Sequence, residues 1–212
     1  MYKQSINSKF LIQIKFFFIC FFITLQSLAD DTASQKNLIY IGSNDAKVKI
    51  KVFSSFTCPH CADFHLNIVS KIEKEFVKTG EVQIIFIDFP LDQAAFNVSK
   101  LLHCLDKNKQ MVFMDTIYQT QSEWTNGSNI DDINVNLKKI VKTLGIDSEK
   151  FEKCLVDEVI SDKILNERID AMQKYSIEST PTIIINEKKI DGSANFKNIK
   201  KKNRKYYLIY EI

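Results

Sequence analysis

The chain has 212 residues, of which 29 are basic and 26 acidic, which gives a formal net charge of +3 at pH 7. Residues 1–29 carry three of the lysines and no acidic residue, so the remaining 26 basic and 26 acidic residues balance. A neutral remainder does not favour nucleic acid as a partner. Residues 30–212 are long enough to form one domain with a hydrophobic core.

The N-terminal segment has the features of a secretory signal. Three basic residues precede an unbroken apolar run at 16–25: Lys3, Lys9 and Lys15. Ser27 and Ala29 then supply the small residues of a cleavage site, which predicts a signal peptide over residues 1–29 that is removed on export. A retained membrane anchor is the alternative, but the apolar run is shorter than the roughly 20 residues of a spanning helix. Cys20 lies within the run and would leave with it.

A βαβ unit follows a short polar lead-in at residues 30–46. Charged and apolar residues alternate over residues 47–53, which is typical of a strand. Residues 59–78 are predicted to form a helix, because apolar residues recur at four-residue steps: Phe64, Ile68, Ile72 and Phe76. Gly80 ends this helix. The nearly continuous apolar run at 82–88 is typical of a buried parallel strand.

Residues 93–175 are predicted to form an all-helical block without strands. Helical spacing of apolar residues covers three stretches, the last with a break or bend: 93–122, 131–144 and 148–175. Three aromatic residues are expected in the core of this block: Phe113, Tyr118 and Trp124.

Residue patterns typical of β-strands occur again after Pro181. The β-branched run at 182–186 predicts a strand, Glu187-Lys188 a turn, residues 189–191 an antiparallel strand and residues 195–209 a final helix. A basic cluster on this helix is interpreted as a solvated face: Lys197, Lys200, Lys201, Lys202, Arg204 and Lys205. We expect the strands on both sides of the helical block to share one sheet, since each alone would expose an apolar face.

Four cysteines remain after removal of the signal: Cys58, Cys61, Cys104 and Cys154. An even number of cysteines in an exported protein suggests two disulfides. Three pairings are possible, and closeness in sequence favours Cys58–Cys61, which leaves Cys104–Cys154. The second pair would join two helices as a structural disulfide, or alternatively tune the chemistry of the first pair.

The motif Cys58-Pro59-His60-Cys61 lies where the first strand gives way to a helix. A cysteine at a helix N-terminus has its thiolate stabilised by the helix dipole and by unpaired N–H groups. We therefore expect Cys58 to be the attacking and attacked sulfur, and Cys61, one turn inside the helix, to be the shielded partner. Pro59 suits the first turn because it lacks an N–H, and His60 can place a positive charge beside the thiolate.

Two other interpretations of the motif are a zinc site and a purely structural disulfide. Zinc needs two further ligands, and no second pair has a suitable spacing among the remaining candidates: His65, His103, Cys104 and Cys154. A disulfide across one helical turn adds little loop-closure entropy. We therefore predict no metal, and no cofactor beyond the redox-active Cys58–Cys61 disulfide.

The segment from Val52 to Cys61, VFSSFTCPHC, resembles the active-site segment of the DsbA family of bacterial thiol–disulfide oxidoreductases. Thr180-Pro181-Thr182 resembles the family's second signature. The resemblance implies a thioredoxin fold over residues 40–200, composed of residues 30–92 and 176–212 with an inserted all-helical subdomain at 93–175. It also implies a cis Pro181 beside the redox pair, and a Thr180 backbone that binds substrate.

Two residues depart from the family pattern. Thr180 stands where the best-known oxidases have valine, and its hydroxyl could form a hydrogen bond near the sulfurs. Val52 stands where some members have a buried acid that helps to move protons.

The function implied by the resemblance is that of a periplasmic, monomeric dithiol oxidase. It would donate the Cys58–Cys61 disulfide to reduced, unfolded exported proteins and be reoxidised by a DsbB-like membrane partner. The alternatives are a disulfide isomerase or reductase of the same fold, or a non-enzymatic thiol or metal carrier.

Overall fold

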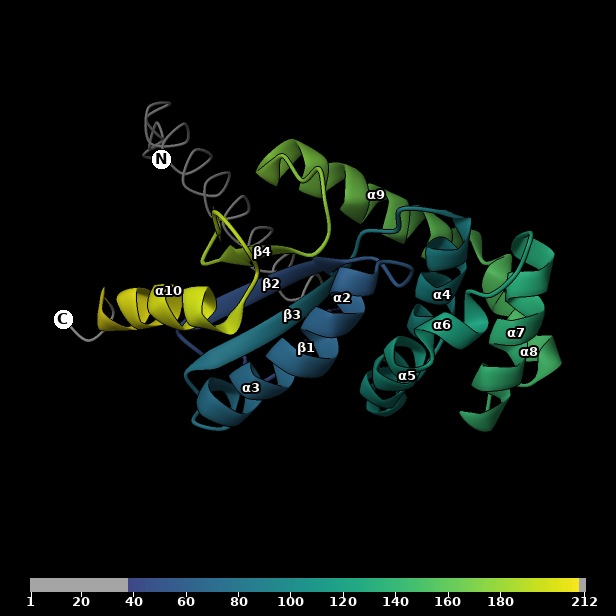
Figure 1. The fold of residues 1–212 in the computed structure, drawn as a ribbon, viewed down its shortest axis with the longest axis horizontal. Helices are drawn as coiled ribbons and strands as arrows, with labels where there is room; N and C mark the ends of the chain where they lie inside the picture. The colour runs from purple at the N-terminus through teal and green to yellow at the C-terminus, as the bar shows by residue number, and fades with distance from the viewer. Residues whose placement is uncertain (1–37, 210–212) are drawn as a thin grey trace, which may run out of the picture. The chain divides into compact units, whose positions relative to one another are not determined.

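The computed structural model of the chain describes residues 38–209, which form a five-stranded sheet in the order β1-β3-β2-β4-β5 (Figure 1). The parallel strands β2 (Val48–Ser54) and β3 (Val82–Asp88) lie at its centre. The antiparallel strands β4 (Thr182–Ile185) and β5 (Lys188–Lys189) extend the sheet beyond β2. Strands from both sides of the helical block therefore share one sheet, as predicted. The predicted signal peptide lies outside the described residues.

The strand β1 (Ile39–Ile41) was not predicted, because the lead-in was interpreted as irregular. It pairs antiparallel with the outer edge of β3. Gly42 then turns the chain with φ +99°, and a Cβ at this position would lie 2.6 Å from the Val82 carbonyl oxygen. Only glycine tolerates both that backbone conformation and that close approach.

The helical connection between β2 and β3 runs from Pro59 to Val77, close to the predicted range. It begins as α2 (Pro59–Asp63), continues through a π-helical segment (Phe64–Val69) and α3 (Ser70–Ile72), and ends in a second π-helical segment (Glu73–Val77). The wider turns were not foreseen, because a four-residue apolar spacing does not distinguish α-helix from short π-helical segments.

The block between β3 and β4 is entirely helical, as predicted. It contains six helices: α4 (Gln93–His103), α5 (Lys107–Gln119), α6 (Gln121–Trp124), α7 (Ile130–Thr143), α8 (Ser148–Leu155) and α9 (Glu158–Tyr175). The predicted stretch 93–122 is divided into three of them. Side-chain caps set several boundaries, since Asp92, Asn129, Asp147 and Asp157 each accept a hydrogen bond from a backbone N–H in the first turn of a helix.

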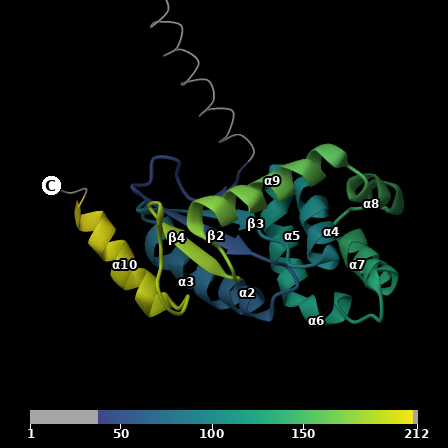
Figure 2. The same cartoon turned by 90° about the horizontal axis from the view of Figure 1, so that it is seen from above.

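The helices cover both faces of the sheet (Figure 2). On one face, Ala171 of α9 and the following Ile177 pack with Phe53 and Ile184 of the sheet. On the other, α2, α3 and α10 (Phe196–Ile209) pack against the main core, in which Ile199 of α10 is fully buried. Within residues 38–209, no helix combines the length and apolarity needed to cross a membrane.

The core of the helical block contains Phe113 and Trp124, both fully buried, as predicted. Tyr118 is buried as well, but its ring stacks on Phe56 with centroids 5.0 Å apart. Because Phe56 lies in the loop between β2 and α2, this contact connects the helical block to the segment that carries the two cysteines.

Candidate functional site

The candidate site lies where β2 ends and α2 begins. Cys58 is the N-cap residue of α2, with extended backbone angles (φ −79°, ψ 117°), and Pro59 occupies the first helical position. The Cys58 carbonyl accepts hydrogen bonds from Cys61 N at 3.0 Å and from Ala62 N at 3.2 Å. The helix thus begins at Pro59, as the sequence predicts, and Cys58 lies at its N-terminus.

The two thiols of the motif are free in this structure and differ in accessibility. Cys58 is 8% exposed, whereas Cys61, one turn later, is 1% exposed. The Cys58 thiol donates a hydrogen bond to the Thr180 carbonyl oxygen at 3.4 Å. Both cysteines are therefore buried, and Cys61 is the more deeply shielded of the two.

The surroundings of Cys61 disfavour its thiolate. Burial raises the pKa of the Cys61 thiol to about 12, and the neighbouring Cys58 adds to this effect. The Thr180 hydroxyl and the Ser55 backbone act in the opposite direction as hydrogen-bond partners of the thiolate. In the reduced state the buried Thr180 Oγ1 has no hydrogen-bond partner of ordinary geometry, so its proton is available to a sulfur anion.

The peptide bond between Thr180 and Pro181 is cis, as the resemblance implies. It lies immediately before β4, and the antiparallel register of Phe53 with Thr182 brings this loop to the end of β2. Thr180 is thereby placed beside Cys58 although 122 residues separate them in sequence. His60 is exposed in the first turn of α2, next to this pair of segments.

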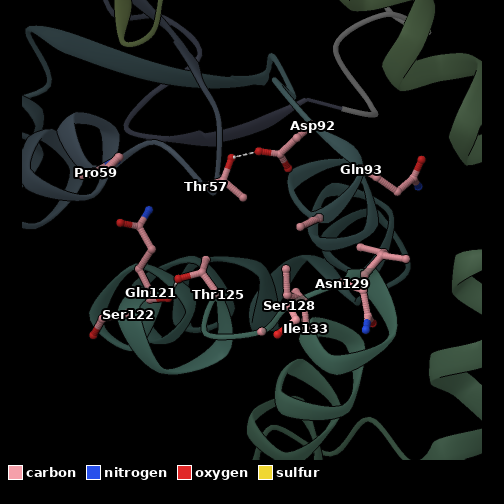
Figure 3. Close-up of a pocket in the computed structure, with 13 residues that line it drawn as sticks. Thr57, Pro59, Asp92, Gln93, Gln121, Ser122, Thr125, Ser128, Asn129 and Ile133 are labelled. Carbon is pink, nitrogen blue, oxygen red and sulfur yellow. Dashed lines mark hydrogen bonds between the residues drawn. The ribbon is translucent and has the colours of Figure 1, made fainter.

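A groove of about 690 Å³ adjoins the site and separates the Cys58 loop from the helical block. Figure 3 shows Thr57 and Pro59 on one side of this groove and Gln121 on the other. The Thr57 hydroxyl donates to Asp92 Oδ2 at 2.7 Å, and Asp92 also caps α4. The Gln121 Nε2 group donates to the carbonyl oxygens of Phe56 at 2.7 Å and Cys58 at 3.1 Å. Sequence reasoning missed these contacts, since only the tertiary fold brings their partners together.

A buried carboxylate was also missed. Asp88, at the end of β3, accepts hydrogen bonds from Ser99 at 2.8 Å and from His103 Nε2 at 2.8 Å. The charge of Asp88 also acts on Tyr118: burial of Tyr118, together with repulsion from Cys61 and Asp88, raises the pKa of its hydroxyl well above the ordinary value. Val52 is buried and apolar, so the chain carries its buried acid on β3 and not at position 52 of β2.

Cys104 and Cys154 form a disulfide between the C-terminal end of α4 and α8. This pairing leaves neither sulfur as a zinc ligand, which removes two of the four candidates for a metal site shared with Cys58 and Cys61. Among residues 38–209, no group of three or more His, Cys, Asp or Glu side chains is arranged to hold a metal ion.

The chain is similar to known proteins of one kind. A family model described as thioredoxin matches residues 34–202. Probable disulfide bond formation protein D of Bacillus cereus is 28% identical over 150 residues, 69% of this chain and 68% of the relative. Disulfide bond formation protein D of Bacillus subtilis is 29% identical over 171 residues, 76% of this chain and 72% of the relative.

The fold is also similar to solved structures. The crystal structure of Wolbachia pipientis alpha-DsbA1 has a TM-score of 0.73 and 28% sequence identity to this chain. The similarity covers 81% of this chain and 91% of that one. The strands, the helical block and the segment with the two cysteines all fall within the matched part of the family model.

Proposed function

Since the chain belongs to the thioredoxin family and is a DsbA-type thiol–disulfide oxidoreductase, we propose that it introduces disulfide bonds into exported proteins through Cys58 and Cys61. The supporting observation is the unequal placement of the two thiols. Cys58 caps α2 and faces the Thr180 carbonyl, whereas Cys61 is buried one turn later. Disulfide exchange needs this combination of one accessible and one shielded sulfur.

The proposed reaction starts from the Cys58–Cys61 disulfide. A client thiolate attacks the Cys58 sulfur, a bond forms between the two, and Cys61 leaves and takes up a proton, as its high pKa favours. A second client thiolate then attacks the client sulfur of this mixed disulfide. Cys58 leaves as a thiolate stabilised by the N-terminus of α2. The client loses two electrons to become a disulfide, and Cys58–Cys61 becomes a reduced pair.

We propose that Thr180 and Pro181 form the edge along which a client segment binds. The Thr180 carbonyl, which accepts the Cys58 thiol proton in the reduced state, would accept a client N–H once Cys58 is engaged in the mixed disulfide. Pro59 and His60 would shape and charge the first turn of α2. The Cys104–Cys154 disulfide is proposed as a structural link within the helical block.

The biological setting is part of the same proposal. The signal peptide at 1–29 would direct the chain to the periplasm, where disulfides persist. There it would act as a monomer on reduced, unfolded clients and be reoxidised by a DsbB-like membrane partner, with no cofactor beyond its own disulfide. Residues 30–92 and 176–212 would form the thioredoxin-like domain, with 93–175 as the helical insertion.

The test is oxidation of a reduced test protein by the native chain and by Cys58→Ala. We expect the variant to lose the activity, because no other sulfur of the pair is accessible. Cys61→Ala should also lose the activity, because it cannot form the Cys58–Cys61 disulfide, whereas the double variant Cys104→Ala/Cys154→Ala should remain active. Full activity of Cys58→Ala would overturn the proposal.

The reduction potential decides the direction of exchange. A value near that of DsbA, about −120 mV, indicates an oxidase, and a value near that of thioredoxin, about −270 mV, indicates a reductase.

A further inference from the structure

The amide of Gln121 connects the helical block directly to the backbone around Cys58. Its Nε2 group donates to the carbonyl oxygen of Phe56 at 2.7 Å and to that of Cys58 at 3.1 Å. Figure 3 shows the side chain extending from α6 towards the loop that carries Thr57 and Pro59. Because both neighbours are carbonyl acceptors, only the NH₂ end of the amide can face them.

The helix that carries Gln121 is held in place by packing. Gln121 is the first residue of α6, and Trp124 in the same helix is fully buried and donates through Nε1 to the Ile117 carbonyl at 2.9 Å. One turn earlier, Tyr118 stacks on the Phe56 ring. The helical block therefore contacts both the side chain and the carbonyl group of Phe56, two residues before the reacting cysteine.

The position of the Cys58 carbonyl affects the cysteine itself. This oxygen accepts the first hydrogen bonds of α2, from Cys61 N and Ala62 N, and the same residue places its sulfur 3.4 Å from the Thr180 oxygen. A shift of this backbone would move the sulfur relative both to the N–H groups of α2 and to the Thr180 edge. In-line exchange between sulfurs is sensitive to such a shift.

We propose that Gln121 is a positioning residue for disulfide exchange. Its amide fixes the Phe56–Cys58 backbone, so that the Cys58 sulfur faces both the N-terminus of α2 and the Thr180 carbonyl. The inference rests on the proposed role of Cys58 as the exchanging sulfur. The helical block would then contribute to disulfide exchange, because its Gln121 amide fixes the backbone that carries the Cys58 sulfur.

Three variants of the full chain test this role. Gln121→Met keeps the length of the side chain and removes both donors, and Gln121→Glu keeps its shape but turns a carboxylate towards two carbonyl oxygens. Ser122→Ala, at an exposed neighbour in the same helix and groove, is the matched control. Each variant is studied at a temperature below its unfolding midpoint, so that it is folded. The first measurement is the pH titration of the Cys58 thiolate by ultraviolet absorbance, and the second is the rate of disulfide exchange with a cysteine peptide.

We expect Gln121→Met to slow exchange by about tenfold, within the range known for small displacements of reacting groups. Its Cys58 thiolate should also form at higher pH than in the native chain. Gln121→Glu should shift the titration further in the same direction, because it adds a negative charge near the sulfur. Ser122→Ala should match the native chain in both measurements.

Native titration and native exchange rates in both Gln121 variants would overturn the inference, even if their unfolding temperatures fall. If Gln121→Met fails to fold, the isosteric Gln121→Glu carries the same test. The proposed function is tested separately by Cys58→Ala, since loss of exchange there is independent of Gln121. The thiolate titration reports on the Gln121 contacts whether or not Cys58→Ala loses the oxidation of the test protein.

Discussion

Cys58 and Cys61 carry the same side chain but have different surroundings. Cys58 caps α2 and has its thiol against a carbonyl oxygen, whereas Cys61 lies inside the first turn with 1% of its surface exposed. Burial raises the pKa of Cys61 from 9.0 to about 12. The reduced protein therefore holds Cys61 as a neutral thiol at neutral pH.

This difference predicts selective alkylation of the reduced protein. Iodoacetamide at neutral pH should modify Cys58 and leave Cys61 unmodified, as measured by mass spectrometry of peptides. Because the folded pKa of Cys61 is raised, its neutral form contributes stability that is full below pH 9 and is lost as the pH rises towards 12. Cys61 should become reactive only in that range or on unfolding in denaturant, which serves as the control. Equal labelling of both cysteines at neutral pH would contradict the prediction.

The sequence was sufficient to predict the roles of residues that act together with near neighbours in the chain. Cys58, Pro59 and Cys61 lie in one helical turn, so their spacing alone indicates which sulfur is shielded. Gln121 and Asp88 could not be found in this way. Gln121 is one of several polar residues in a helical stretch, and its importance comes from two carbonyl oxygens more than 60 residues away.

At the scale of elements, the turn between β4 and β5 depends on one carboxylate. Asn186 and Glu187 both have positive φ, 43° and 66°, which is unfavourable for residues with a Cβ. Glu187 forms ion pairs with Lys174 at 2.6 Å and with Lys51, and it accepts a hydrogen bond from Tyr175. The turn is thereby attached to the end of α9 and to β2.

These contacts predict an acid-sensitive contribution to stability. Burial opposes ionisation of Glu187, but hydrogen bonds from Lys174, Lys51 and Tyr175 outweigh it and hold the pKa at about 2. Because the folded pKa is lowered, the stabilisation is present above pH 4.5 and is lost as the pH falls towards 2. Since the side chain is 52% exposed, solvent screening limits the effect to about 1 kcal/mol.

Urea denaturation of the native chain and of Glu187→Gln at several pH values measures this contribution. The variant should be less stable at neutral pH, and the difference should shrink as the pH falls below 4.5. Glu149→Gln is a suitable control, because Glu149 makes one exposed ion pair, with Lys153. A difference for Glu187→Gln that does not change with pH would rule out the ionic origin.

Elements with a strong internal period were predicted well, and those that depend on neighbours were not. The βαβ unit and the helical block have apolar spacings that identify them without tertiary information. β1 has only three residues, too few for a pattern, and forms because β3 offers an unpaired edge. The division of residues 93–122 into three helices follows from short breaks near Asp106 and Thr120, which interrupt the helix without interrupting the apolar spacing.

The whole molecule has a strongly uneven charge distribution despite its balance. Residues 30–212 contain 26 basic and 26 acidic residues, and six of the basic ones form the cluster at 197–205. The rest therefore has 20 basic and 26 acidic residues, so a cluster of +6 opposes a remainder of −6. The cluster lies on α10, where Lys197, Lys201 and Lys205 are exposed and Lys200 forms an ion pair with Glu75.

This separation of charge predicts that a chain starting at residue 30 binds a cation-exchange resin at neutral pH although its net charge is near zero. The interaction should weaken steeply with salt, because the Debye length falls from about 10 Å at 0.1 M to about 3 Å at 1 M. Replacing Lys197, Lys201 and Lys205 by Gln should abolish retention. The same replacement at three exposed lysines of the helical block removes equal charge and should leave most of the retention: Lys107, Lys109 and Lys142. Equal loss in both triple variants would mean that net charge, and not the face of α10, governs binding.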